Sequence, residues 1–312
     1  MYNYVLINDI LREKLEKSKP SELLYIQKMV DIVNNNYKEL NENRFRNSIS
    51  VYQSLKLVYK FLSDLNKDYA AYFLDAIENN RIILDYEFDS GWSYYDDIYG
   101  KIMLIPINHS IRDSSTMVHE LMHDLNMRPD YLSITRFLFT ESISILGEML
   151  YASYLIENNL YIHDIKVNLK DLFWSASRIS MKNDFDIQLM LEYLNDGYVN
   201  DKTIKNLRLN REYNYQIDYS LSELETSNFG FDMDQRYSIG ILFACYMYER
   251  IKNNKKNIVE LFEINEMIND ISFKELMAYL GLETEKKDEF LLTNDSLDIL
   301  EKSYKKVLKS IG

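Results

Sequence analysis

Two of the four histidines in this 312-residue chain lie four residues apart, on either side of a glutamate, in the stretch TMVHELMHDLN. Residues i and i+4 of an α-helix lie on the same face, one turn apart. If the stretch is helical, His119 and His123 can present imidazole nitrogens to the same metal ion. Glu120 lies about a quarter turn round, where its carboxylate could hold a water molecule without being a ligand. The spacing therefore predicts a metal site on a helix.

This order of residues is the HExxH pattern, in which zinc peptidases use the two histidines as ligands and the glutamate as general base. The pattern also occurs in helical proteins in which two histidines merely occupy a half-polar face. A catalytic zinc needs a third protein ligand and an open position for water. The rest of the chain must therefore supply one more ligand, on an element that returns to this helix.

A candidate third ligand follows in the strongly helical stretch FLFTESISILGEMLYASYLIEN. Pro129 and Asp130 favour a turn before it, which would bring this second helix back against the first. Glu141 and Glu148 share one helix face among Leu, Ile and Ala, where a carboxylate is costly unless it is paired, protonated or bound to a metal. We predict Glu141 as the third ligand and Glu148 as a partner of a ligand histidine. The alternative for either glutamate is a position that faces solvent.

The periodicity changes directly before the HExxH stretch. RIILDYEFD is short, β-branched and aromatic, SGWSYYDDIYG supplies turn residues, and KIMLIPI is a second apolar run, which together predict one small sheet. Zinc peptidases of this architecture pair the substrate backbone with an edge strand beside the metal helix. We predict KIMLIPINHS as that strand, with Leu104, Ile105 and Pro106 contacting substrate and Pro106 marking an edge. His109 is either a substrate contact or an ordinary surface histidine.

The remaining sequence is predicted to be helical. Gly (8) and Pro (3) are scarce against average usage of about 7% and 5%, which indicates long helices and few tight turns. Gly281 is expected to end a short helix in FKELMAYLGL. We therefore predict a mostly α, zincin-like fold with one small sheet before the HExxH helix. Residues 1–79 are expected to form an N-terminal helical lobe, packed on a zinc peptidase catalytic region at residues 80–312.

The net charge, the apolar runs and the cysteine count limit the partners and the cellular location expected for the chain. The formal net charge of −13 repels phosphate backbones and anionic lipids, which argues against nucleic acid and membrane partners. The longest apolar run, at residues 237–248, is too short to span a bilayer, and the N-terminus lacks a secretory signal pattern. The single cysteine, Cys245, excludes an internal disulfide and suits a reducing compartment. A cytoplasmic location is expected.

These motifs, taken in order, resemble the oligoendopeptidase F and thimet oligopeptidase family of zinc metallopeptidases. The matching segments are GKIMLIPIN, the helix TMVHELMHDL, TESISILGEML (similar to the family's Glu-x-x-Ser-x-x-x-Glu ligand helix), QRYSIGILFACYMYERI (similar to its Tyr-x-x-Gly helix) and SFKELMAYLGLE. The resemblance implies an endopeptidase acting on short, unfolded peptides. It further implies one Zn²⁺ per chain, held by His119, His123 and Glu141, with Glu120 as the general base.

Three features depart from the family pattern. Met122 stands where the family usually has Gly, and the chain is much shorter than family members usually are, which implies a reduced N-terminal lobe. The family also places a His and a Tyr near the Tyr-x-x-Gly segment to stabilise the tetrahedral intermediate, whereas ETSNFGFDMDQRYSIG has no histidine. Tyr237 is the best remaining donor and Arg236 a weaker one. Tyr237 is equally compatible with an ordinary core tyrosine.

Three other interpretations stay open at the level of sequence. The missing histidine favours a catalytically weak or inactive relative, which would bind a peptide or protein partner through the cleft that holds substrate in the family. The short length favours a zinc protease dedicated to one protein or propeptide. A helical scaffold with a fortuitous HExxH would bind no stoichiometric zinc.

Overall fold

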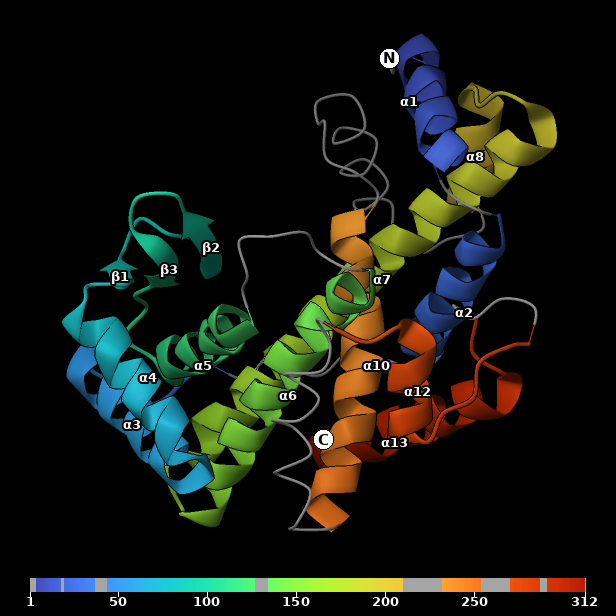
Figure 1. Cartoon of the computed structure of the whole chain (residues 1–312). Helices are drawn as coiled ribbons and strands as arrows, with labels where there is room; N and C mark the ends of the chain where they lie inside the picture. The colour runs from blue at the N-terminus through green and yellow to red at the C-terminus, as the bar shows by residue number, and fades with distance from the viewer. Residues whose placement is uncertain are drawn as a thin grey trace.

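The computed structural model describes residues 4–17, 20–36, 44–126, 134–209, 232–253, 270–286 and 291–311. Within these ranges the chain is mostly helical, as predicted (Figure 1). The helices are α1 (Tyr4–Lys17), α2 (Pro20–Asn36), α3 (Val51–Leu65), α4 (Lys67–Glu78), α5 (Ile111–Asn126), α6 (Ile134–Glu157), α7 (Ile162–Asp196), α8 (Asp201–Leu209), α10 (Asp232–Asn253), α12 (Phe273–Leu280) and α13 (Asn294–Ile311). Gly281 ends α12 in a left-handed conformation, as expected. None of the described helices has both the length and the apolarity needed to cross a membrane.

The predicted small sheet lies directly before α5. Its strands are β1 (Ile82–Asp85), β2 (Trp92–Asp96) and β3 (Gly100–Pro106), in the order β1-β3-β2. β3 pairs in parallel with β1 and antiparallel with β2, so that Leu104 lies opposite both Ile83 and Trp92. β3 is therefore the central strand, and the prediction that it forms an edge is wrong. The segment SGWSYYDDIYG, expected to supply turn residues between two strands, contains β2, which pairs with β3.

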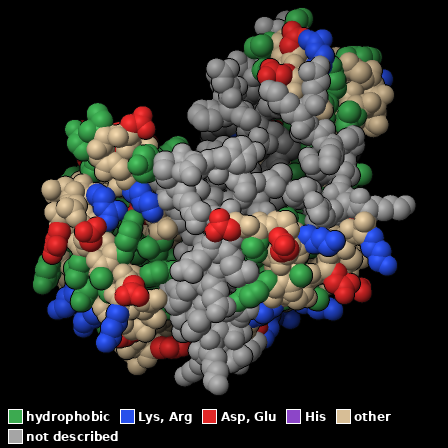
Figure 2. All heavy atoms as spheres, viewed as in Figure 1, with side chains coloured by type: hydrophobic (Ala, Val, Ile, Leu, Met, Phe, Trp, Pro, Cys, Tyr) green, Lys and Arg blue, Asp and Glu red, His purple; other side chains and the backbone are tan. Residues whose placement is uncertain are grey.

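Turn residues occupy only the short connection from β2 to β3. Asp96 Oδ1 accepts hydrogen bonds from the backbone N–H groups of Ile98 and Tyr99, both at 2.8 Å, and Gly100 has a φ of +74° that favours glycine. The aromatic residues before this turn favour a strand. Hydrophobic side chains are exposed over this part of the molecule (Figure 2). The large exposed ones on or near the sheet are Ile83, Tyr86, Trp92, Tyr94, Tyr95, Ile98 and Tyr99.

Most of the helices share one hydrophobic core. Its buried residues come from α2 to α7, from β3, and from α10, α12 and α13. A smaller cluster joins α1, α2, α7 and α8 toward the far end of the 35-residue α7 (Figure 1). Residues on both sides of position 80 share the main core, so the regions expected at residues 1–79 and 80–312 pack together. The boundary between them stays a prediction.

The turn from β3 into α5 is closed by Asp113. Its carboxylate accepts hydrogen bonds from the backbone N–H groups of Asn108 and His109, at 3.0 and 2.9 Å. The His109 side chain is exposed and its Nε2 lies 3.2 Å from the hydroxyl oxygen of Tyr86, which follows β1. The structure therefore agrees with the interpretation of His109 as a surface histidine.

The other end of α5 is tied to the sheet and to α4 through Asp124. The buried carboxylate of Asp124 accepts a hydrogen bond from the Tyr72 hydroxyl at 2.6 Å and lies 3.4 Å from the guanidinium of Arg81. Lys101 Nζ on β3 donates to the backbone carbonyl of Asp124 at 2.6 Å. These contacts fix the helical turn that immediately follows the second histidine of HExxH.

Candidate metal centre

The structure brings together the three residues predicted as metal ligands, between α5 and α6. His119 Nε2 lies 3.0 Å from His123 Nε2, and Glu141 Oε2 lies 3.4 and 3.6 Å from these two nitrogens. Two ligand atoms at about 2.0–2.1 Å from a tetrahedral zinc ion are themselves about 3.3 Å apart. The three observed separations therefore fit a zinc site with two histidines and one glutamate.

The electrostatics of this cluster favour a bound cation. Glu141 is 4% exposed, and its Oε2 has no hydrogen-bond partner among the described residues. Burial raises the pKa of Glu141, but the imidazoles of His123 and His119 outweigh burial and hold that pKa well below its usual value. Burial likewise lowers the pKa of His119, but the carboxylates of Glu141 and Glu148 outweigh it and raise that pKa well above its usual value. The cluster thus stabilises positive charge, and a buried carboxylate oxygen without a donor suits a metal ligand.

Each of the two predicted ligand histidines has a polar contact at Nδ1, the ring nitrogen that faces away from the other histidine. His119 Nδ1 lies 2.8 Å from Glu148 Oε1, and His123 Nδ1 lies 3.0 Å from Ser144 Oγ. With hydrogens on Nδ1, both Nε2 lone pairs face the third ligand, as metal binding requires. The predicted contact of Glu148 with a ligand histidine is present. The sequence prediction missed Ser144, although it is the serine of the Glu-x-x-Ser segment.

Glu120, the predicted general base, is held by β2. Ser93 Oγ lies 2.8 Å from Glu120 Oε2 and 2.9 Å from the Glu120 backbone carbonyl. A Cβ at Gly91 would lie 2.6 Å from Glu120 Oε1, so the absence of a side chain at position 91 leaves room for the carboxylate. Neither Ser93 nor Gly91 was a sequence candidate, because the segment that carries them was predicted to be a turn.

The residues predicted to contact substrate lie one strand away from the exposed edge. Leu104 is paired on both sides, and Ile105 and Pro106 are buried. Ile105 belongs to the main core. Among the described strands, the edge that lies beside Glu120 belongs to β2.

α10 contacts α6 at Glu141, the predicted third ligand. A Cβ at Gly240 would lie 2.9 Å from Glu141 Cβ and 3.2 Å from the Glu141 backbone carbon, so glycine is needed for this approach. Tyr237 lies one turn earlier on α10 and packs, partly buried, against the main core. Its role as a donor to the reacting carbonyl stays a prediction. The side chain of Arg236 lies outside the described part of the chain.

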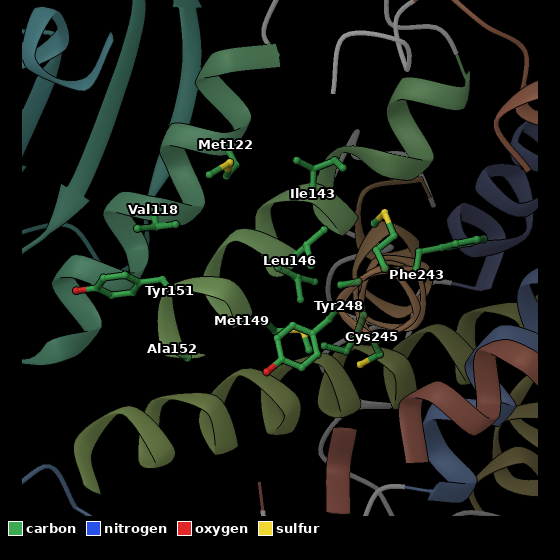
Figure 3. Packing of buried hydrophobic residues seen from close by; sticks show 14 of the residues in the cluster. Val118, Met122, Ile143, Leu146, Met149, Tyr151, Ala152, Phe243, Cys245 and Tyr248 are labelled. Carbon is green, nitrogen blue, oxygen red and sulfur yellow. The ribbon is translucent and has the colours of Figure 1, made fainter. Parts of the chain in front are cut away.

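Met122 occupies space that α6 leaves open at Gly147. A Cβ at Gly147 would lie 2.7 Å from Met122 Cγ and 3.4 Å from Val118 Cγ1. Figure 3 shows Met122 and Val118 on α5 beside Ile143 and Leu146 of α6. The family that this sequence resembles usually has glycine at the position of Met122. Here the larger side chain is accommodated by Gly147 on the facing helix.

We expect Gly147→Ala to lower the free energy of unfolding by about 1–3 kcal/mol, because the added methyl overpacks the contact with Met122. In a Met122→Ala background the same substitution should cost much less, since the clashing atom is gone. Urea unfolding of the wild type, the two single variants and the double variant measures this coupling. Strictly additive effects would contradict the match between the two positions.

Comparison with known proteins rests on structure, since no family profile and no curated protein sequence matches the chain. A structure from Bacillus anthracis designated an oligoendopeptidase F matches with a TM-score of 0.59 and 13% identity, over 99% of this chain and 56% of that one. PZ peptidase A, solved with an inhibitor, matches with a TM-score of 0.58 and 12% identity, over 99% and 59%. A structure from Chlamydophila abortus designated a peptidase matches with a TM-score of 0.52 and 16% identity, over 99% and 56%.

The chain thus spans less than three fifths of the length of each of these three structures. At identities this low, the likeness establishes the fold and leaves activity to be argued from the site. The chain has the mostly helical fold that these peptidase and oligoendopeptidase F structures share.

Proposed function

We propose that this chain is a zinc-dependent metallopeptidase that hydrolyses internal bonds of short peptides. One observation carries the proposal: His119, His123 and Glu141 converge at zinc-like separations, with Glu120 directly following His119 on the same helix. The shared fold of the peptidase structures supports it.

The residues of the site have distinct roles in this proposal. His119, His123 and Glu141 would hold the ion, and zinc, when bound, supplies Lewis acidity that lowers the pKa of water to about 7 and polarises a carbonyl. Glu120 accepts the proton of the attacking water and delivers it to the leaving amine. The Ser93 hydroxyl donates a hydrogen bond to Glu120 Oε2 at 2.8 Å and so orients that carboxylate.

The substrate strand is proposed to run along β2. β2 is an edge of the described sheet, and Ser93 places it directly beside Glu120. An extended peptide can add to such an edge through main-chain hydrogen bonds, which tolerates varied side chains. Trp92 and Tyr94 point away from the Ser93 face and are exposed, so they would flank alternate side chains of that peptide.

Tyr237 is proposed as the donor to the reacting carbonyl oxygen. Support comes from its place one turn before Gly240, which touches Glu141. The segment before Tyr237 contains no histidine, and the loss of one comparable donor costs other enzymes about 3 kcal/mol. The missing histidine favours a second candidate function, that of a weakly active or inactive relative that binds a peptide or protein.

The proposed partners are short, unfolded peptides rather than nucleic acids or membranes. A cytoplasmic location is proposed because the single cysteine, Cys245, suits a reducing compartment.

The first experiment is metal analysis of the purified chain, together with hydrolysis of a mixed peptide library before chelation, after chelation and after zinc is restored. We expect about one zinc per chain, and cleavage of internal peptide bonds that disappears with chelation and returns with zinc. These results together would establish a zinc endopeptidase.

Other outcomes separate the remaining hypotheses. Stoichiometric zinc without cleavage of any peptide would favour the binding protein. Cleavage of one defined sequence, with no general peptide hydrolysis, would favour a protease dedicated to one substrate. A wild-type chain that takes up no zinc would overturn the proposal.

A further inference from the structure

A chain of hydrogen bonds extends from the candidate metal centre to α7. His119 Nδ1 lies 2.8 Å from Glu148 Oε1, and the other oxygen of Glu148 lies 2.8 Å from Ser115 Oγ. Ser115 Oγ in turn lies 2.9 Å from Asn168 Nδ2. Ser115, Glu148 and Asn168 are all buried. α5, α6 and α7 each contribute one residue behind the ligand histidine.

The chemistry of these groups gives the chain of bonds a single direction. An amide nitrogen only donates, so Ser115 Oγ accepts a hydrogen bond from Asn168. The one hydroxyl hydrogen of Ser115 is then free to point at Glu148 Oε2, an oxygen that accepts. Glu148 Oε1 is left to accept the hydrogen on His119 Nδ1. That tautomer places the lone pair of His119 on Nε2, toward His123 and Glu141.

The two ligand histidines are supported differently. His123 Nδ1 meets Ser144 on α6, the helix that also carries Glu141. The support of His119 runs through a carboxylate and a hydroxyl to a third helix, α7. Asn168 on α7 is not itself a metal ligand. Its side-chain amide nevertheless ends the series of hydrogen bonds that begins at His119 Nδ1.

We infer that Asn168 and Ser115 are positioning residues of the metal centre, which fix the hydrogen-bond direction at Glu148 and so the Nδ1–H tautomer of His119. This inference rests on the proposed function, because it concerns affinity for the zinc ion proposed there. It assigns a role to α7, from which the predicted site drew no residue.

Asn168→Asp tests the inference, because it keeps the shape of the side chain but replaces the donor with an acceptor. The new carboxylate competes with Glu148 for the hydroxyl hydrogen of Ser115. We expect the Kd for zinc, measured by competition with a chromophoric chelator, to rise about 10- to 100-fold. In ¹⁵N-histidine spectra of the zinc-loaded chain, which has only four histidines, one Nδ1 proton should lose its protection from exchange.

α7 offers a matched control. Asn183 on the same helix is also buried, and its Nδ2 donates to Ser238 Oγ on α10 at 2.9 Å rather than to the serine that contacts Glu148. Asn183→Asp should lower the Tm of the zinc-free protein about as much as Asn168→Asp does. Its Kd for zinc should stay within about twofold of the wild-type value.

The outcomes are distinct. An unchanged zinc Kd in Asn168→Asp, or an equal rise in both variants, would overturn the inference. If Asn168→Asp does not fold, Ser115→Ala removes only one hydroxyl and must raise the zinc Kd in the same direction. A wild-type chain that binds no zinc would instead overturn the proposed function, and the titration of the wild type shows this first.

Discussion

Glu120→Gln is expected to lower kcat/KM for peptide hydrolysis by about 10²–10⁴-fold, with about one zinc still bound per chain. The amide has nearly the shape of the carboxylate and can still accept a hydrogen bond from Ser93, which lies 2.8 Å from Glu120 Oε2. It cannot accept the proton of the attacking water. The measurement is kcat/KM on a peptide taken from the library, beside the zinc content of the same preparation.

Ser93→Ala is the matched control for this variant, because it keeps the carboxylate and removes only the hydroxyl that orients it. Its loss of activity should be clearly smaller than that of Glu120→Gln. Full activity in Glu120→Gln would exclude this glutamate as the general base. A simultaneous loss of zinc would show that the substitution acts through the metal ligands.

Glu141→Ala is expected to reduce zinc content from about one per chain to near zero at micromolar zinc, because a His₂Glu site loses one of its three protein ligands. Zinc should also stop stabilising the fold. A ligand at 1,000 times its Kd stabilises the native state by about 4 kcal/mol, so the wild-type Tm should rise with added zinc while that of the variant does not. Metal analysis and thermal unfolding with and without zinc measure both effects.

Glu148→Gln is the useful comparison, since it changes the group behind His119 and leaves all three ligands in place. It should weaken zinc binding by about 10- to 100-fold but still reach one zinc per chain at saturation. Retention of stoichiometric zinc by Glu141→Ala would mean that another residue is the third ligand.

The parts of the site that follow helical periodicity could be predicted from the sequence. His119 and His123 share a helix face because of their spacing alone. Glu141 could be singled out because a carboxylate on an otherwise apolar helix face needs a partner. The helix-to-helix return that joins them passes through residues 127–133, which are outside the described part of the chain.

The parts of the site that depend on contacts between distant segments could not be predicted from the sequence. The prediction that β3 forms an edge relied on Pro106. It failed because strand order is not local, and because Trp92–Asp96 mixes aromatic residues with Ser and Asp, as turns also do. The role of Ser93 follows only once that strand is placed beside α5. Asn168 gives no sequence signal, since its partner on α5 is 53 residues away.

Three of the eight glycines lie where the main chain meets the candidate centre: Gly91 at Glu120, Gly147 at Met122 and Gly240 at Glu141. At these points backbone atoms, which have no rotamers, meet the side chains or backbone of the helices that carry the ligands and the base. Such close backbone contacts limit how far these helices can shift relative to one another. If the proposed zinc binds here, it would need little ordering of the protein, so most of its interaction energy would remain available as affinity.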